Sequence, residues 1–472
     1  MNELTISLDA KSSEPLYEQI YKYIKKEIQS GGLPFGKRLP STRKLAGFLQ
    51  VSRTTVDMAY EQLVSEGYIE AVACRGYFVC ELEGLCRIET EKAVLSQTAA
   101  QEQTAYAYDF SPNGVDLNSF PHNAWRKLSR DILLEENRLL FQLGDPQGEW
   151  ELRETIAEYL HQARGVSARP EQIIVGAGND FLLLLLCSMF GTGMRIAVES
   201  PTYRKAYDLF RNLSNEVRIV AMDDAGMRAD KLSETDAQIA YVMPSHQYPL
   251  GIVMPVKRRM QLLAWASAAP DRFIIEDDYD SEFRYRGKPI PALQGYDRED
   301  RVIYLSTFSK SIAPAIRVSY MVLPHCLLPL YRERARTISS TVSRVDQILI
   351  ARFLNGGYYE RHLNKMRAVY KSRHDALLEE LRAFTGIGSI SGENAGVHVL
   401  LTFTNGMTES EAVRRAADCG VKVYGLSRYY VGEASGNGSS TVILGYANLT
   451  EQEIREAAGR LRGAWLEQEY DS

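Results

Sequence analysis

Apolar side chains recur with the spacing of an α-helix in three segments near the start of the chain. Residues 16–28 form an amphipathic pattern that stops at two consecutive glycines. Two shorter helical patterns follow, and the serines before them, Ser41 and Ser52, are of a type that caps helix starts by accepting backbone N–H bonds. We expect the apolar face of the first short helix to carry Leu45, Phe48 and Leu49, and that of the second Val56, Ala59, Tyr60, Leu63 and Val64.

The spacing changes at residue 68. Residues 68–72 and 76–79 have the composition of two short strands joined around Arg75 and Gly76, which predicts a β-hairpin. A helix, a helix–turn–helix and a hairpin in this order predict a winged helix–turn–helix domain over residues 1–81. Residues 82–107 are polar and lack a repeating apolar face, so we expect a linker there.

Apolar strand-like runs alternate with longer helical patterns from residue 108 to the end of the chain. Such alternation is typical of a mostly parallel sheet covered by helices on both faces. Residues from about 365 to 472 mix helices and strands and predict a smaller α+β lobe. The predicted fold is therefore multidomain, with an α+β winged helix, an α/β body over residues 108–472 and a smaller C-terminal α+β lobe within that body.

Composition and charge exclude several classes of protein. The 472 residues are 45% hydrophobic and 24% charged, which is enough apolar material for a large core and excludes global disorder. No run of about 18 apolar residues exists, so we expect no membrane-spanning helix. The start of the chain lacks a basic segment followed by an apolar one, so we expect no secretory signal and a cytoplasmic location. The net charge of −5 excludes a globally basic nucleic-acid binder but allows a small DNA-binding module on an acidic body.

The six cysteines predict neither a disulfide framework nor a metal site. Cys74, Cys80 and Cys86 are spaced evenly with no histidine among them, which is not the spacing of a zinc finger. We expect reduced thiols throughout and no metal. Cys74 and Cys80, close to the predicted hairpin, are more readily explained as buried core thiols than as oxidant sensors.

The predicted winged domain concentrates positive charge. From Pro34 to Tyr60 the chain has five basic residues and one acid, Asp57. A recognition helix enters the major groove with its N-terminal residues leading, and here these include Arg53, whose fork-shaped cation suits guanine edges or phosphates. The alternative is a solvated basic face on a protein–protein module. The predicted DNA contacts are Lys37, Arg38, Arg43, Lys44, Ser52, Arg53, Thr54, Thr55, Arg75 and Gly76.

A second group of residues has the chemistry of a cofactor site. Lys310 follows a strand-like run that ends at Thr307, and a lysine in such a loop can form a Schiff base with an aldehyde cofactor. The hydroxyls of Thr307 and Ser309 and the cation of Arg317 suit a phosphate. Taken alone this is a weak signal, because most lysines on loops are simply solvated.

Three further segments add to this group. Asp277 ends a strand-like run, where ligands bind in open α/β sheets, and a carboxylate there can pair with a pyridinium nitrogen. Gly178 and its neighbours form a strand-to-helix turn whose backbone N–H groups can bind an anion. Tyr203 follows another strand and can flank a planar ring. Each has a plain alternative, such as a surface acid cluster or an ordinary glycine turn.

Two motif sets resemble known families. The order PSTRKLA, VSRTTV, AYEQLVSEGYI and GYFV resembles the winged helix of GntR-type transcription regulators over residues 13–81. The order of the cofactor-site segments resembles fold-type I pyridoxal-phosphate aminotransferases over about residues 108–465. A winged helix joined to such a body is similar to the MocR-type branch of GntR regulators, which includes a GABA-responsive regulator, and the resemblance covers nearly the whole chain.

The resemblance implies roles for individual residues. Lys310 would form the internal aldimine with pyridoxal 5'-phosphate (PLP), Asp277 would hold the pyridine nitrogen, and Tyr279 would contact the ring hydroxyl. Tyr203 would lie beside the ring. The residues implied around the phosphate are Gly178, Asn179, Asp180, Thr307, Ser309 and Arg317.

The sequence departs from the family at positions expected to contact the cofactor ring and the effector. Tyr248 stands where aminotransferases commonly have an asparagine, so His246 or Gln247 is a candidate replacement for the ring-oxygen contact. By the resemblance, the GABA-responsive regulator has arginines at the positions that match Asn448 and Lys205. A neutral amide cannot make a charged bidentate contact, and lysine is a point charge and not a fork, which argues against GABA as effector. The candidate effector contacts are Arg204, Lys205, Arg428 and Asn448.

The resemblance implies a PLP-dependent transcription regulator that is not primarily an enzyme. A small amine or amino acid would react at Lys310 by transaldimination and alter binding to an operator with repeated half-sites. The protein would act as a homodimer, which by the family pattern would be head-to-tail. Two alternatives remain: an active PLP-dependent aminotransferase with a fused DNA-binding module, and a sensor of PLP itself that controls the supply of vitamin B6.

Overall fold

The computed structural model describes residues 6–9, 12, 14–81, 106–134, 138–285, 290–432 and 439–466. The chain divides into two compact units, residues 1–103 and 104–472, which we call the N-terminal unit and the body. Most of the predicted linker, residues 82–105, lies outside the described residues, as does Cys86. Among the described helices, none combines the length and the apolar character that crossing a membrane requires.

The N-terminal unit is a winged helix–turn–helix, as the sequence predicts. Its elements are α1 (Leu16–Gln29), α2 (Thr42–Leu49), α3 (Arg53–Ser65), β1 (Ile69–Val72) and β2 (Gly76–Val79). Ser41 and Ser52 cap α2 and α3, each accepting a hydrogen bond from a backbone N–H three residues on. Gln50 adopts a left-handed conformation (φ 54°) that makes the turn between the two helices. The core packs α1 against α3 and the antiparallel hairpin.

Three sequence expectations about burial in this unit are wrong. Phe48 on α2 and Val64 on α3 are 52% and 36% exposed, because Leu45 and Ala46 fill the α2 face and Leu63 closes the α3 face. Cys74 is not a core thiol, since it lies exposed in the turn of the hairpin with φ 61°. Cys80, at the end of the hairpin, is half-buried.

The body is built on a seven-stranded sheet with the order β4-β12-β11-β10-β9-β5-β6. β12 alone runs antiparallel to its two neighbours, so the prediction of a mostly parallel sheet is confirmed. The strands are β4 (Ile173–Gly176), β5 (Arg195–Glu199), β6 (Glu216–Val220), β9 (Ile239–Val242), β10 (Phe273–Asp278), β11 (Val302–Thr307) and β12 (Ser319–Val322).

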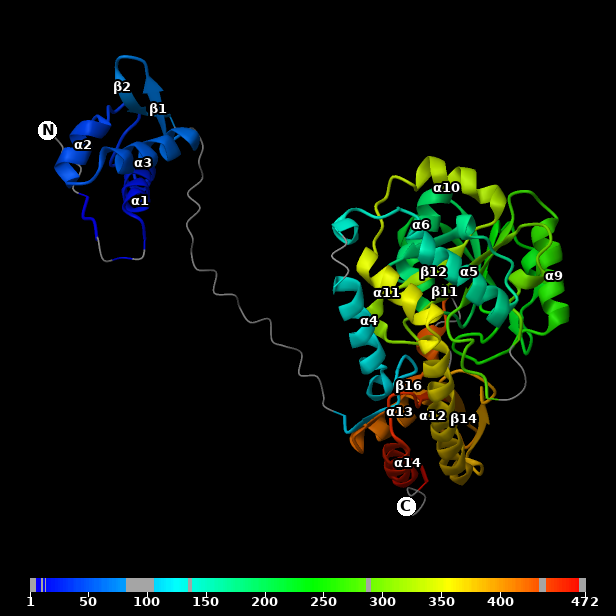
Figure 1. Cartoon of the computed structure of the whole chain (residues 1–472). Coiled ribbons are helices and arrows are strands. Elements are labelled where there is room, and N and C mark those ends of the chain that lie inside the picture. The colour runs from blue at the N-terminus through cyan, green and yellow to red at the C-terminus, as the bar shows by residue number, and fades with distance from the viewer. Residues whose placement is uncertain are drawn as a thin grey trace. The chain divides into compact units, whose positions relative to one another are not determined.

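Helices cover both faces of this sheet (Figure 1). Successive residues of β11 show the alternation, since Tyr304 belongs to one core cluster whereas Ile303 and Leu305 belong to the cluster on the opposite face. The helices packed on one face are α6 (Asn179–Phe190), α7 (Arg204–Asn212) and α10 (Leu328–Arg334). Those packed on the other are α5 (Trp150–Arg164), α8 (Ala229–Ser233), α9 (Val256–Ser267), α11 (Arg344–Asn355) and α12 (Tyr358–Leu381).

The C-terminal lobe is a four-stranded antiparallel sheet, β13-β14-β17-β16, with helices α13 (Glu409–Asp418) and α14 (Glu451–Leu466). Its strands are β13 (Gly388–Ser391), β14 (His398–Phe403), β16 (Tyr424–Gly425) and β17 (Thr441–Gly445). The lobe also includes the start of the body, because β3 (Tyr108–Asp109) pairs in parallel with β15 (Val421–Lys422). The sequence does not reveal this pairing, because the two segments are short and more than 300 residues apart.

Two smaller elements complete the body. Helix α4 (His122–Leu134) packs against α11, and β7 (Met222–Asp223) and β8 (Gly226–Met227) form a small hairpin beside the main sheet. The carboxyl ends of β10 and β11 and the start of α6 are brought to one edge of the sheet.

Candidate functional site

A cavity of about 230 Å³ opens at this edge of the main sheet. It brings together nine of the ten residues that the sequence places around a cofactor, the exception being Gly178, which borders it at the start of α6. The lining residues are Asn113, Asn179, Asp180, Tyr203, Lys205, Met243, Tyr248, Asp277, Tyr279, Thr307, Ser309, Lys310, Pro314 and Arg317.

Lys310 lies in the loop after β11, with its Nζ facing the cavity. The pKa of its ammonium is lowered to about 8, chiefly by burial; the charge of Asp280 opposes this shift and that of Lys205 adds to it. Nζ donates a hydrogen bond to Oδ1 of Asn113 at 3.3 Å. A neutral amine is a nucleophile, so this environment prepares Lys310 for bonding to a carbonyl carbon.

Asn113 is a site residue that the sequence analysis does not identify. It belongs to the segment FSPNGVDL at the start of the body, where an asparagine beside a proline and a glycine has the appearance of an ordinary turn residue. Its contact with Lys310 spans 197 positions of sequence. No local pattern predicts such a contact.

Asp277 occupies the end of β10, and its carboxylate is 3% exposed. Nδ2 of Asn179 donates to one oxygen at 3.0 Å, and the hydroxyl of Tyr241 donates to the other at 2.5 Å. Burial raises the pKa of Asp277 to about 7, aided by the charges of neighbouring carboxylates. An acid held in this state can ionise fully against a cationic ring nitrogen placed in the cavity. Tyr241 is a second residue that the sequence analysis does not single out.

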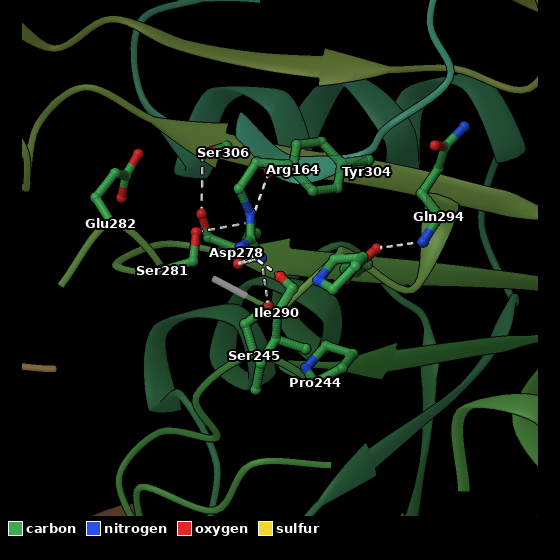
Figure 2. A network of polar contacts seen from close by, with 12 residues as sticks. Arg164, Pro244, Ser245, Asp278, Ser281, Glu282, Ile290, Gln294, Tyr304 and Ser306 are labelled. Atoms are coloured by element: carbon green, nitrogen blue, oxygen red, sulfur yellow. Dashed lines mark hydrogen bonds and ion pairs between the residues drawn. The ribbon is translucent and has the colours of Figure 1, made fainter. Parts of the chain in front are cut away.

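The carboxylate next along the chain, Asp278, points to the other face of the sheet and is fully paired (Figure 2). Arg164 at the end of α5 contacts both of its oxygens, at 2.8 and 3.2 Å. Tyr304 donates to Asp278 at 2.6 Å, and Arg164 also donates to Ser245 at 2.7 Å. This ion pair keeps the Asp278 pKa below its usual value despite burial, and it fixes the strand end from which Asp277 projects.

The turn before α6 is shaped for an anion. Gly178 has φ 96°, and a Cβ there would lie 2.1 Å from Nη2 of Arg317, so only glycine lets the guanidinium approach the helix start. Arg317 also contacts Asp180 at 3.4 Å. Oγ of Ser309 is buried and has no hydrogen-bond partner among the described residues. An unsatisfied hydroxyl, a guanidinium and a helix N-terminus around one space fit a phosphate group.

Thr307 differs from the other residues implied around a phosphate. Its hydroxyl lines the cavity but already accepts hydrogen bonds from the backbone N–H of Ser309 at 3.1 Å and the hydroxyl of Ser319 at 2.8 Å. Its contribution within the described structure is therefore to hold the loop that carries Ser309 and Lys310.

Three tyrosines form the walls of the cavity. The rings of Tyr203 and Tyr248 meet edge-to-face at 6.1 Å, and Tyr279 packs against Tyr248 in the same way at 5.8 Å. Tyr248 donates to the hydroxyl of Tyr429 in the C-terminal lobe at 2.9 Å. Neither His246 nor Gln247 is among the lining residues, so the structure does not bring these two proposed substitutes to the cavity wall.

Of the four candidate effector contacts, only Lys205 lines the cavity. Arg204 pairs with Asp208 at 3.3 Å and donates to a backbone carbonyl of the lobe. Arg428 packs its guanidinium over the ring of Tyr424 at 5.9 Å. Asn448 donates to the backbone carbonyl of Asp109 at 2.9 Å and does not line the cavity.

The candidate DNA contacts share one unit and are mostly exposed. Arg53 begins α3 and makes a local ion pair with Asp57 at 3.4 Å, with 69% of its side chain exposed. Ser52 and Thr55 are engaged with each other in the helix cap, at 2.7 Å between their hydroxyls. Arg75 packs over Phe78 in the hairpin, and Arg38 lies beside Gly76. Exposed positions are Arg38, Arg43, Lys44, Ser52, Arg53, Thr54 and Arg75; Lys37, Thr55 and Gly76 are half-buried.

Comparison with known proteins agrees with this two-part architecture. Residues 16–79 match the family of bacterial regulatory proteins called the gntR family, and residues 109–461 match aminotransferase class I and II. The HTH-type transcriptional regulator YhdI of Bacillus subtilis is 40% identical over 98% of both chains. The probable rhizopine catabolism regulatory protein MocR of Rhizobium meliloti is 31% identical over 97% of this chain and 95% of its own.

Among solved structures, the body resembles a kynurenine aminotransferase of Pyrococcus horikoshii determined with PMP. The TM-score is 0.68 at 28% identity, and the likeness covers 77% of this chain and 91% of that one. The two regulators match 98% and 97% of this chain, whereas the likeness to this enzyme covers 77% of it.

Proposed function

This chain belongs to the MocR-type transcription regulators, in which a GntR helix–turn–helix is fused to an aminotransferase class I and II domain, and from this premise we propose that it senses a small amine or amino acid through PLP. The observation that carries the proposal is the convergence on one cavity of Lys310, Asp277 and the anion-binding turn at Gly178. Lys310 has the amine that bonds an aldehyde, Asp277 has the carboxylate that pairs with a pyridine nitrogen, and the turn at Gly178 has the N–H groups that bind a phosphate.

The fit assigns a task to each group of residues. The phosphate would be held by Ser309, Arg317 and the start of α6. Asp277 would pair with the ring nitrogen. The edges of the ring would be flanked by Tyr203 and Tyr279. When bound, PLP supplies an aldehyde that bonds an amine and a ring that draws electrons from it. Lys310 holds and releases a proton at Nζ, and Asn113 keeps that atom pointed into the cavity.

The test is the visible absorption spectrum of the purified full chain, followed during titration with a panel of amines and amino acids. We expect a visible band from the cofactor bound at Lys310 and a shift of that band with one class of compound. A band that no compound shifts would favour a sensor of PLP itself. Turnover of an amino donor with a keto acceptor would favour the aminotransferase alternative, and the absence of any band would overturn the cofactor proposal.

The lowered pKa of Lys310 predicts the pH dependence of cofactor uptake. Only the neutral amine bonds an aldehyde, so the uptake rate should rise about tenfold per pH unit below about pH 8 and level off above it. Lys205→Ala removes a charge that lowers this pKa, so the midpoint should move to higher pH. The growth of visible absorbance after PLP is mixed with the cofactor-free protein measures both. A rate that is flat between about pH 6 and pH 9 would contradict the prediction.

Lys205 is the candidate that meets an anionic group of the effector. It lines the cavity beside Lys310, and the neighbouring Arg204 is engaged with Asp208 outside it. Lys205→Ala should weaken the binding of an amino acid that shifts the visible band by about tenfold to a hundredfold, the range for losing a charge-assisted hydrogen bond. Arg204→Ala removes an equal charge one position away and should leave the titration unchanged. Equal effects of the two variants would show that only net charge matters.

A continuous segment leads from Lys310 toward the N-terminal unit. Asn113 accepts the hydrogen bond of Lys310 Nζ, and the preceding Asp109 is held by Asn448 and by the β3–β15 pairing. Residues 106–109 are the first described residues of the body after the linker. An amine that replaced Lys310 on the cofactor would therefore change the hydrogen bond between Lys310 and Asn113, which lies in the segment that follows the linker. We propose that this segment transmits effector binding to the DNA-binding unit.

Exposed apolar side chains near the start of the body support a homodimer. Phe141 and Leu143 are 77% and 89% exposed, and further exposed apolar residues surround them in sequence, namely Leu133, Leu134, Leu139 and Trp150. Several large exposed apolar side chains within one stretch of a folded chain mark that stretch as a candidate interface. A second copy of the chain is the proposed occupant, in keeping with an operator of repeated half-sites; by the family resemblance the arrangement would be head-to-tail.

Phe141→Asp should weaken dimer formation by at least about tenfold, because burial of an aromatic side chain contributes about 1.5–3 kcal/mol. Sedimentation of the full chain over a range of concentrations measures this. Leu184→Asp, at a 43% exposed apolar position on α6, is the matched control and should not change the oligomeric state. A Phe141→Asp protein with the sedimentation behaviour of the unmodified chain would place the interface elsewhere.

A further inference from the structure

His246 forms a buried hydrogen-bonded group with two neighbours of the cofactor cavity. Its Nδ1 lies 2.9 Å from a carboxylate oxygen of Asp280 and 3.0 Å from the hydroxyl oxygen of Tyr279. The side chains of His246 and Asp280 are both about 1% exposed. A nitrogen this close to a buried carboxylate must carry a hydrogen, because two lone pairs would repel each other. The imidazole is therefore the donor at Nδ1, and the oxygen of Tyr279 is an acceptor toward it.

This arrangement decides what Tyr279 offers to the cavity. Because its oxygen accepts from Nδ1–H, the hydrogen of the phenol is not used on His246. Tyr279 lines the cavity, so that hydrogen, which also interacts with the carboxylate of Asp280, can be donated to a ring oxygen bound there. The remaining ring facing His246 is that of His398, 5.4 Å away, whose pKa burial lowers to about 3; it therefore adds no charge.

The opposite edge of the imidazole rests on the C-terminal lobe. Nε2 of His246 is buried and has no hydrogen-bond partner within the described parts of the chain. A Cβ at Gly396 would lie 2.0 Å from Cε1 of His246, so a side chain there would displace the ring. Gly396 is itself fixed, since its carbonyl accepts from Tyr285 at 2.6 Å and from Tyr446 at 2.9 Å. The imidazole is wedged between the body and the lobe, and its polar role is confined to Nδ1.

We propose that Asp280 and His246 are positioning residues that aim the Tyr279 hydroxyl at the ring oxygen of the cofactor, and that Gly396 of the lobe sets the depth at which the imidazole sits. This inference rests on the proposed PLP site. It makes the contact between the two lobes of the body part of the cofactor's electronic environment, although Gly396 does not line the cavity.

The test is the pH at which the visible band of the full chain loaded with PLP changes between its two forms. A hydrogen bond donated to the ring oxygen stabilises the negative charge on that oxygen. The oxygen then attracts the proton on the neighbouring lysine nitrogen less strongly, so this proton is lost at lower pH. Losing that donor should therefore raise the midpoint by about one pH unit. Tyr279→Phe gives the reference shift, and His246→Leu should reproduce it.

Two conservative changes separate positioning from simple damage. His246→Asn keeps an N–H at the place of Nδ1 and should retain the original midpoint. Gly396→Ala should raise the midpoint as His246→Leu does, and adding it to His246→Leu should raise the midpoint no further, because the imidazole that the new Cβ meets is already absent. Gly406→Ala is the control for backbone strain: this lobe glycine also has positive φ (87°), but its Cβ would meet no atom within 4 Å.

The outcomes distinguish this inference from the proposed function. No visible band in the unmodified chain would remove the PLP site, and the inference with it. A band whose midpoint moves in Tyr279→Phe but not in His246→Leu would overturn the inference alone. A Gly396→Ala shift that adds to the shift of His246→Leu, or that Gly406→Ala reproduces, would remove the role given to the lobe.

Discussion

Replacing Lys310 by alanine is expected to abolish the visible band of the PLP-loaded protein while leaving the chain folded and able to bind DNA. Lys310 is the lysine among the described residues that lines the cavity with a lowered pKa and a direct hydrogen bond to Asn113. Lys205, the other lysine that lines the cavity, is not expected to replace the covalent bond of Lys310 to the aldehyde. The absorption spectrum and the operator affinity of the same preparation measure the two halves of this result.

Lys310→Arg is the matched control for charge. It keeps a cation in the loop after β11 but cannot form the bond, so it should also lack the band. A band that persists in either variant would show that another amine holds the cofactor. Loss of DNA binding in both would show that the cofactor site is required for DNA binding itself and not only for its regulation.

Replacing Arg53 by alanine is expected to weaken operator binding by about tenfold to a hundredfold while the visible band is unchanged. Arg53 leads α3, is 69% exposed, and makes only a local pair with Asp57 at 3.4 Å. A bidentate contact to a base or phosphate contributes about 1–3 kcal/mol to DNA binding. Fluorescence anisotropy with a labelled operator fragment, together with the spectrum of each variant, measures the effect.

Arg414→Ala is the matched control for this change. Arg414 is an exposed arginine on α13 with the same kind of local pair, to Asp418 at 3.1 Å, but it belongs to the body. It should leave operator affinity unchanged. If Arg53→Ala retains full affinity, α3 is not the recognition helix; if it also loses the band, the two units are coupled more tightly than proposed.

The local elements of the N-terminal unit could be predicted because their signals are local. A capping serine, an apolar stripe and a glycine stop each act within a few residues, and α2, α3 and the hairpin begin and end close to the predicted positions. The burial of Phe48 and Val64 could not be predicted from the same stripes. Whether an apolar residue at the edge of a stripe is covered depends on what packs opposite, and here Leu45, Ala46 and Leu63 fill the core in place of Phe48 and Val64.

The cofactor cavity was predictable to the extent that its residues sit at strand ends and carry recognisable chemistry. Lys310 follows the buried strand β11 and Asp277 lies near the end of the buried strand β10, and parallel neighbours bring such ends to one edge. Asn113 and His246 were not assigned their contacts, because these depend on the packing of the lobe against the body. The pairing of β3 with β15 belongs to the same class, since it brings together short segments from opposite ends of the body.

The measurement that tests the central claim most directly follows operator affinity and the visible band in one sample of PLP-loaded full chain as amines and amino acids are added. The account predicts that a compound that shifts the band also changes operator affinity over the same concentration range, and that in Lys310→Ala it changes neither. A compound that shifts the band without any change in affinity, or that changes affinity equally in Lys310→Ala, would contradict the claim that the cavity at Lys310 controls DNA binding.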